Sequence, residues 1–314
     1  MKRYRKFSRT LVCLLAAAGM FFGTSVMATE TGSKAADTKG SAKVEKQVQD
    51  STRVEAGKKR EAIVKEAVAA LEQTKKAIDA LKKKNKQEAL DALAMVTGKL
   101  EIVLARDPDL ANAPIDVRVE QFDLYATVET VQDAVKQAAD LLDDGEVQQA
   151  RMILSGLASE IDIVITALPL KGYTDGIKAV AKLVDDEKYE EATASIYDLL
   201  STLVMTRDVI PLPILRAEEL LKKADELARK EGRSADENKE LTVLLDNARD
   251  QIKMAEALGY GDHKEYKAFY TQIKEIRKKT EDGKFGMGFV DELKNSLKSF
   301  KEKILHSTTK ASNK

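Results

Sequence analysis

Apolar side chains recur every three or four residues along most of this chain, which is the spacing at which an α-helix buries one face. The positions between them are rich in lysine, glutamate and aspartate, which suit the solvent side of such helices. Each apolar stripe therefore predicts one amphipathic helix. The stripes cover residues 64–81, 90–103, 147–164, 196–203, 241–255 and 266–273.

Local sequence also marks several helix ends. Ser234 with Glu237, and Asp262 with Glu265, have the spacing of a capping box at the start of a helical run. Gly259 comes where the preceding helix has to end, because glycine readily takes up the left-handed conformation of a helix terminus. These signals place two helix starts and one helix end.

One segment departs from the helical period. Residues 114–119 alternate apolar and polar side chains, with Ile115, Val117 and Val119 on one side. This alternation is typical of an extended chain. It predicts a short extended stretch, either a hairpin arm or a strap across the helices.

An internal repeat relates three segments, residues 81–108, 142–169 and 184–211, which align without gaps. We interpret each unit as a helix, a polar turn, a second helix that opens at a small alanine, and a proline stop. A chain rich in leucine and alanine also aligns with itself by chance, but the prolines coincide at both offsets. The coinciding residues are Ala89, Ala150 and Ala192 after the turns, and Pro108, Pro169 and Pro211 at the ends.

Together these patterns predict the fold class. We expect an all-α fold in which antiparallel helical hairpins form an irregular helical-repeat or bundle domain of about nine or ten helices. One short extended segment lies near residues 114–119.

The first residues have the pattern of a secretory signal peptide. A basic start without acidic residues precedes an apolar run over residues 11–23, and Val26 and Ala28 are small enough for signal peptidase. We expect cleavage after Ala28 and a periplasmic location. An uncleaved membrane anchor is the alternative, but the apolar run is shorter than the roughly 18–20 residues that span a bilayer. Cleavage would remove Cys13, the only cysteine, and with it any disulfide or thiol chemistry.

Composition divides the rest of the chain. We expect a signal peptide at 1–28, a disordered tether at 29–53, a helical domain at 54–282, an amphipathic helix at 283–306 and a disordered tail at 307–314. After cleavage 47 basic residues face 52 acidic ones, a net charge of −5 that argues against nucleic acid as a partner. No later segment is long and apolar enough to cross a membrane, so stable insertion is not expected.

Several phrases of this sequence, from TGKLEIVLARDPDLANAPIDVRV at 97–119 to KKTEDGKFGMGF at 278–289, resemble the YfdX family of enterobacterial periplasmic proteins. The resemblance implies a periplasmic, all-helical domain linked to stress responses, with chaperone-like behaviour and small-molecule binding proposed for the family. It brings no catalytic residue. The phrases are TGKLEIVLARDPDLANAPIDVRV at 97–119, FDLYA at 122–126, DLLDDGEVQQARMILSGLASEI at 140–161, VIPLPILRAEELL at 209–221, AEALGYGDHKEYKAFY at 255–270 and KKTEDGKFGMGF at 278–289.

The residues offer little catalytic chemistry. His263 and His306 are the only histidines and lie far apart in the sequence, and no nucleophile, zinc or phosphate-binding motif is present. The acidic run at 143–146 lacks the alternating ligand spacing of a calcium loop. We therefore expect no enzyme activity, no metal site and no cofactor.

Two features suit binding. The first is an aromatic group at 260–270, which is usually core but would bind an apolar ligand or an unfolded segment if its face were open. The second is a terminal stripe surrounded by lysines, which could dock on its own domain, on a partner or on an anionic membrane surface. The candidate residues are Tyr260, Tyr266, Phe269 and Tyr270 in the first group, and Phe289, Leu293, Leu297 and Phe300 in the second.

These observations favour a stress-associated, chaperone-like binding protein that holds an apolar small molecule or a client polypeptide between helix hairpins. The alternative is a structural or interaction module that acts through the basic terminal helix. A homo-oligomer is possible with either function.

Overall fold

The computed structural model describes residues 38–311, with side chains placed as far as residue 305. The predicted signal peptide, residues 29–37 of the predicted tether and the last three residues of the predicted tail lie outside the described residues. From Lys39 on, the described chain forms one compact unit. None of its helices is long and apolar enough to cross a membrane.

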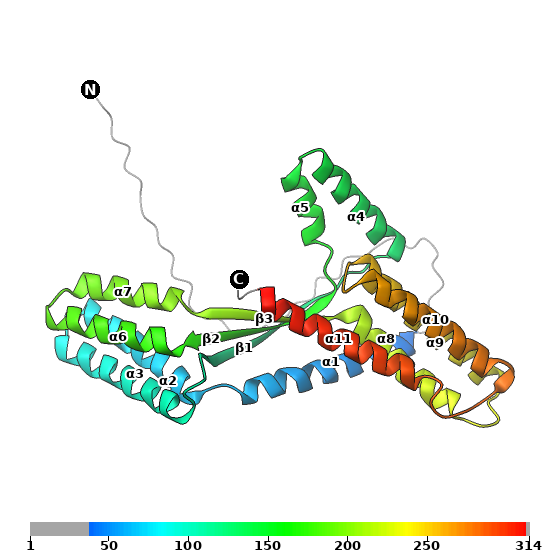
Figure 1. Cartoon of the computed structure of the whole chain (residues 1–314), viewed down its shortest axis with the longest axis horizontal. Helices are drawn as coiled ribbons and strands as arrows, with labels where there is room; N and C mark the ends of the chain where they lie inside the picture. Colours follow the sequence, from blue (N-terminus) through cyan, green and yellow to red (C-terminus); the bar gives the residue numbers. More distant parts are fainter. Residues whose placement is uncertain (1–37, 312–314) are drawn as a thin grey trace. The chain divides into compact units, whose positions relative to one another are not determined.

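The described residues form eleven α-helices, one short 3-10 helix and three strands (Figure 1). The expectation of a mostly helical fold built from hairpins is confirmed. The elements are α1 (Thr38–Glu61), α2 (Lys65–Lys82), α3 (Lys86–Arg106), β1 (Asn112–Phe122), α4 (Val128–Asp143), α5 (Val147–Ser155), β2 (Glu160–Pro169), α6 (Leu170–Asp185), α7 (Tyr189–Ser201), β3 (Val204–Pro211), α8 (Leu212–Ala228), α9 (Ala235–Ala257), α10 (His263–Thr280), η1 (Glu281–Gly283) and α11 (Asp291–Ala311).

The three strands form an antiparallel sheet in the order β1-β2-β3. The extended segment predicted near 114–119 is confirmed and is longer than expected. Two other predictions are wrong, because α5 and α7 end at Ser155 and Ser201, and β2 and β3 occupy residues expected to continue these helices. The stretch from Ile161 to Thr166 is β-branched except at Asp162, which favours a strand. Ile161 and Val164 are three residues apart, which is also the spacing of a helical stripe, so the apolar pattern predicted a helix here.

The first half of the repeat is visible in the backbone. Lys84, Gly145 and Glu187 are at equivalent positions in the three turns, and all have left-handed backbones, with φ of 53°, 79° and 60°. The alanine five residues later is fully buried in each unit. The prediction that a proline ends the second helix of each unit is wrong in two units. Pro169 and Pro211 instead end the strands β2 and β3, directly before α6 and α8.

The first core is a four-helix bundle in which the hairpin α2–α3 packs against the hairpin α6–α7. In its interior the Tyr173 hydroxyl donates to Thr74 Oγ1 at 3.2 Å, so both buried hydroxyls have a partner. Gly176 brings α6 close to α7, because a Cβ there would lie 2.3 Å from the Leu199 side chain. Two repeat units therefore bury their apolar faces against each other.

The second core lies between α8, α9, α10 and α11, and a third lies between α1, the sheet and the start of α8. The predicted disordered tether is wrong for residues 38–53, which form the first part of α1. Val44 and Val48 lie one helical turn apart and are buried beside Val117 and Ile161 of the sheet. The apolar partners that order this segment come from distant parts of the chain. At the other end, α11 extends to residue 311 and replaces most of the predicted tail.

Candidate functional site

Most of the predicted binding residues are core residues. Phe300 of α11 packs edge-on against Tyr266 and Phe269 of α10, with ring centroids 5.4 Å apart in both pairs. Leu293 and Leu297 belong to the same core. The open aromatic face that ligand binding would need is therefore filled by α11. Tyr260, Tyr270 and Phe289 lie at the edge of this core and are half-buried.

The tyrosine hydroxyls of this group are already engaged. Tyr260 donates to Glu160 Oε2 at 2.7 Å and Tyr270 donates to Glu256 Oε2 at 2.6 Å, while Tyr266 donates to the Tyr260 carbonyl. Burial, followed by the hydrogen bond to Glu160, raises the pKa of Tyr260. These phenols therefore stay protonated and serve as structural donors.

The terminal helix docks on its own domain, one of the three partners that the sequence left open. Its apolar stripe is buried against α8 and α10. Two of its lysines are paired across the same contact: Lys294 donates to Asp225 at 3.0 Å and Lys301 donates to Glu218 at 2.6 Å. The face that would have bound a partner or a membrane is therefore covered.

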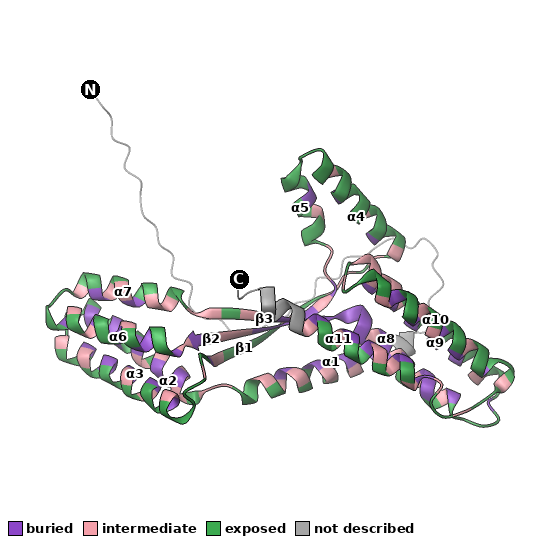
Figure 2. Ribbon diagram, in the orientation of Figure 1, coloured by how far each residue is buried: buried purple, intermediate pink, exposed green. Residues whose placement is uncertain are grey.

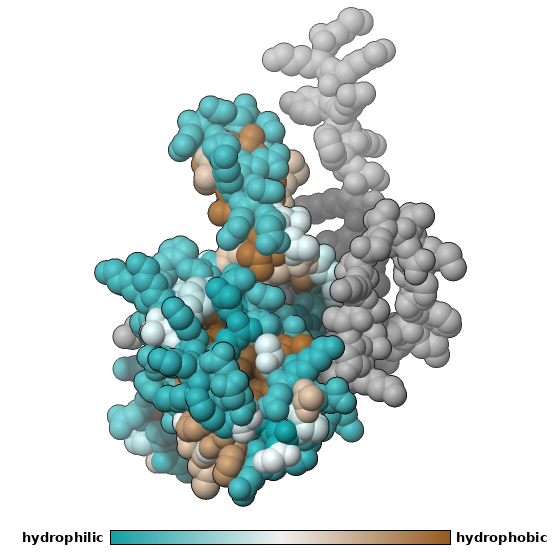
Figure 3. All heavy atoms as spheres, turned by 90° about the vertical axis from the view of Figure 1, so that its right-hand side faces the viewer, coloured by the Kyte–Doolittle hydropathy of each residue, from teal (hydrophilic) through white to brown (hydrophobic). Residues whose placement is uncertain are grey.

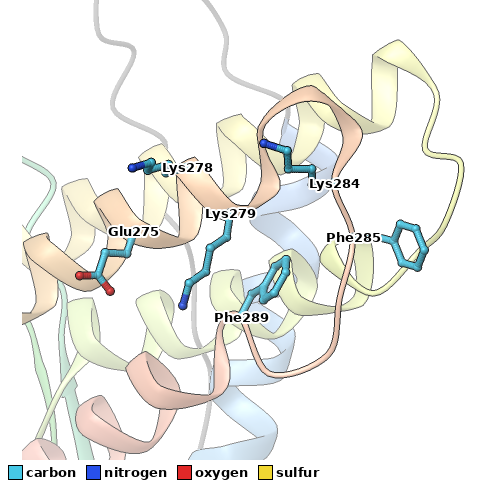
Figure 4. Close-up of a pocket in the computed structure, with 6 residues that line it drawn as sticks. All are labelled: Glu275, Lys278, Lys279, Lys284, Phe285 and Phe289. Atoms are coloured by element: carbon cyan, nitrogen blue, oxygen red, sulfur yellow. The ribbon is translucent and has the colours of Figure 1, made fainter.

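A hollow of about 600 Å³ lies between the end of α10 and the loop that leads into α11 (Figure 4). Figure 4 shows Lys279 and Phe289 leaning toward each other, whereas Phe285 lies on the far side of the loop. Of the predicted residues, only Phe289 lines it. The lining residues are Glu275, Lys278, Lys279, Lys284, Phe285 and Phe289.

The loop that forms one wall is held in place by Arg233. This buried guanidinium donates to the Lys284 carbonyl at 2.6 Å and to the Thr280 carbonyl at 3.3 Å. The Gly286 amide donates to the Ala228 carbonyl at 3.1 Å. The glycine-rich loop at 283–288 is thus tied, on both sides of Phe285, to the end of α8 and to the turn that follows it, and this wall of the hollow is preformed.

The chemistry of the hollow combines positive charge with aromatic surface. None of its three lysines has an ion pair among the described residues, and Glu275 is its one carboxylate. Lys279 Nζ lies 6.0 Å from the Phe289 ring centroid, the outer limit of a cation–π contact. Phe285 is 46% exposed and is available for contact. These groups suit an anion that carries an apolar body.

Comparison with known proteins places the repeat units in a family. A model described as YfdX protein matches residues 70–209. Residues 70–209, slightly less than half of the chain, therefore match the YfdX family. A search among curated proteins finds no match. A solved crystal structure of Salmonella Typhi YfdX matches with 15% identity and a TM-score of 0.33, over 48% of this chain and 93% of that one.

The YfdX region contains the first two repeat units and most of the third, and it ends within β3, before α8. The hollow therefore lies outside it. The phrase KKTEDGKFGMGF contains the lysines and both phenylalanines of the hollow, but its family resemblance assigns no binding role to them. A cluster of three lysines around a phenylalanine in a glycine-rich loop was the signal available. The described residues contain no group of three His, Cys, Asp or Glu side chains that could hold a metal.

The YfdX region also contains a buried carboxylate that the sequence reading missed. Asp162 of β2 is fully buried, and neither of its oxygens has a hydrogen-bond partner. Arg207 Nη1 lies 3.1 Å from Oδ2 without the alignment of a hydrogen bond. Burial, followed by the charge of Glu160, raises the pKa of Asp162 from 3.8 to about 6.

This carboxylate should make the stability of the YfdX region depend on pH. Because its pKa is higher in the folded state, the folded protein binds this proton more readily between about pH 4 and 6. The contribution of Asp162 to the free energy of unfolding is then lowest above pH 6 and rises as the pH falls toward 4. Asp162→Asn should raise the free energy of unfolding by about 1–3 kcal/mol at pH 7.5, with the gain lost near pH 4. Urea unfolding at both pH values would measure this, and an equal effect at both would contradict it.

Proposed function

We propose that this YfdX-family chain is an exported, non-catalytic binding protein that takes an apolar anion in the hollow beside α10. One observation carries the proposal: two phenylalanine rings and three lysines without ion pairs line a single hollow of about 600 Å³. Its size is within the range of small-molecule sites. The signal-like start of the chain and its family membership support a periplasmic, stress-associated role.

Charge and apolar surface would act together on such a ligand. The ammonium groups of Lys279 and Lys284 would hold the acidic head, Phe289 would cover the apolar body, and Phe285 would contribute at the outer edge of the hollow. Charge-assisted hydrogen bonds contribute roughly 1.5–3 kcal/mol, so one lysine is worth about a tenfold change in affinity or more. The alternative, a module that acts through the terminal helix, is less favoured, because the apolar stripe of that helix is buried.

The proposal is tested with anilinonaphthalene sulfonate, an aromatic anion whose fluorescence rises on binding. We expect saturable binding that weakens about tenfold or more in Lys279→Gln and in Lys284→Gln. Lys267→Gln is the matched control, because Lys267 is equally exposed on α10 but does not line the hollow. Binding that all three variants weaken equally, or leave unchanged, would rule out this site.

A polypeptide with acidic and aromatic side chains is the other ligand that this chemistry fits. A peptide that carries both side-chain types should then displace the dye from the wild-type protein. If the dye leaves only on addition of small anions such as dodecanoate, the small-molecule function stands and the client function fails.

A further inference from the structure

The hairpin formed by α4 and α5 has an apolar face that nothing in the described chain covers. Its helices bury only Val131, Ala138 and Ala150. Figure 2 shows most of both helices as exposed, and Figure 3 shows apolar residues along the hairpin, the uppermost coloured part of that view. Four larger aliphatic side chains are exposed in addition: Val135 at 38%, Leu142 at 47%, Val147 at 53% and Leu154 at 44%.

These four side chains form one stripe on each of the two helices. Val135 and Leu142 are seven residues apart on α4, and Val147 and Leu154 are seven residues apart on α5. Residues seven apart lie two turns along the same side of a helix, which is the spacing of helices that pack side by side in bundles. The exposed face therefore has the pattern of a bundle interface and not of scattered surface residues.

The repeat shows what covers this face in the other two units. Val135, Leu142 and Leu154 occupy the same repeat positions as six residues of the four-helix bundle, all of which are at most 2% exposed. There, one hairpin of the repeat packs against another hairpin of the repeat. With the same offsets extended into the helix before each turn, the equivalent residues are Thr74, Leu81 and Leu93, and Ile177, Val184 and Ile196. The equivalents of Val147 are Lys86 and Tyr189, which are half-buried.

The charges of the hairpin agree with an apolar partner. At 100° per residue, the carboxylates of Glu129, Asp133 and Asp140 lie on the opposite side of α4 from the apolar stripe. A face that bound a basic peptide would have carboxylates along its border. On α4 only Asp143, in the last turn, lies at the border of this face, about 90° from the stripe. The face is therefore mostly apolar and suits a second apolar face. The α2–α3 and α6–α7 hairpins already pack against each other. The partner hairpin that α4–α5 lacks is therefore supplied by a second copy of the chain.

We propose that the α4–α5 hairpins of two copies of this chain pack face to face and form a second four-helix bundle. The interface is isologous, with the same stripe contributed by both copies. The inference rests on the hairpin and its repeat, and it is independent of the ligand proposed for the hollow.

Sedimentation equilibrium of the purified protein tests this, with Leu154→Glu as the disrupting variant. We expect a dimer for the wild type and a dissociation constant at least about a hundredfold higher for the variant, since a carboxylate would be buried without a partner. Met152→Glu is the matched control: Met152 is 71% exposed on the same helix but points away from the stripe. Because both positions are exposed, circular dichroism should show unchanged folding for both variants.

A wild-type monomer at tens of micromolar would overturn the proposal, as would a dimer that survives Leu154→Glu or is lost with Met152→Glu. Mixing labelled Leu154→Glu with wild type separates face-to-face pairing from docking on another surface. Face-to-face pairing predicts that the mixed dimer is also weakened. Mixed dimers with wild-type affinity would show that the stripe docks elsewhere, and would contradict the proposal.

Discussion

Replacing Phe300 with alanine is expected to lower the free energy of unfolding by about 3–5 kcal/mol, the usual cost of removing a buried aromatic ring. Phe300 is 2% exposed and lies between the rings of Tyr266 and Phe269. It also packs on Gly261, where φ is +76° and a Cβ would lie 2.3 Å from the ring. The truncated side chain would leave a cavity where α11 meets α10.

Urea unfolding measures this effect, and Phe285→Ala is its control. Phe285 is the same residue type at the opposite extreme of burial, so its truncation should cost about 0.5 kcal/mol or less. Binding of anilinonaphthalene sulfonate should also distinguish the two variants. Phe285→Ala should weaken dye binding, whereas Phe300→Ala should leave dye binding to the folded protein intact. If Phe300→Ala abolished binding without loss of stability, the residue would be a ligand contact as the sequence suggested.

Arg216→Ala should be the second large effect, a loss of about 2–4 kcal/mol. Arg216 of α8 donates to both oxygens of Asp123, at 3.0 and 2.6 Å, and to Glu45 of α1 at 2.6 Å. Burial opposes the guanidinium charge, but these hydrogen bonds outweigh it and raise the pKa of Arg216. Its removal would leave the Asp123 carboxylate largely buried without its cation.

Arg216→Lys should restore only part of this loss, because one ammonium group cannot reproduce the paired hydrogen bonds to Asp123. Arg118→Ala serves as the control, since Arg118 and Asp116 form an ion pair that is more than half exposed. Such pairs contribute about 0–1 kcal/mol. Equal losses in unfolding free energy for Arg216→Ala and Arg118→Ala would show that the buried pair stabilises the fold no more than the exposed one, and would contradict this prediction.

Helix starts and turns were predictable where one short stretch of sequence decides them. The capping box of Ser234 and Glu237 is present with both of its hydrogen bonds. At Asp262 only half of the predicted box forms: its side chain accepts from the Lys264 amide, while Glu265 pairs with Lys303 of α11. A distant lysine thus changed a pattern that local spacing had predicted.

The strands β2 and β3 were missed for a related reason. Ile161 and Val164 fit a helical stripe by spacing, yet β2 is buried over most of its length and needs β1 and β3 beside it. Their pairing joins residues some 40 to 60 positions apart, which a local apolar period does not encode. The hollow was not predictable for the same reason. The hydrogen bond from Arg233 to the Lys284 carbonyl, which holds its wall, joins residues that lie on either side of the α9–α10 hairpin in the sequence.

Local sequence thus specified many of the helices, several of their ends and the turn and buried alanine of the threefold repeat, because these depend on side chains within about one or two turns of each other. The tertiary structure decided which faces are covered. The same repeat position is buried at Leu93 and Ile196 and exposed at Leu154. Burial depends on a partner that the local pattern does not contain, and for α4 and α5 no described part of the chain supplies that partner.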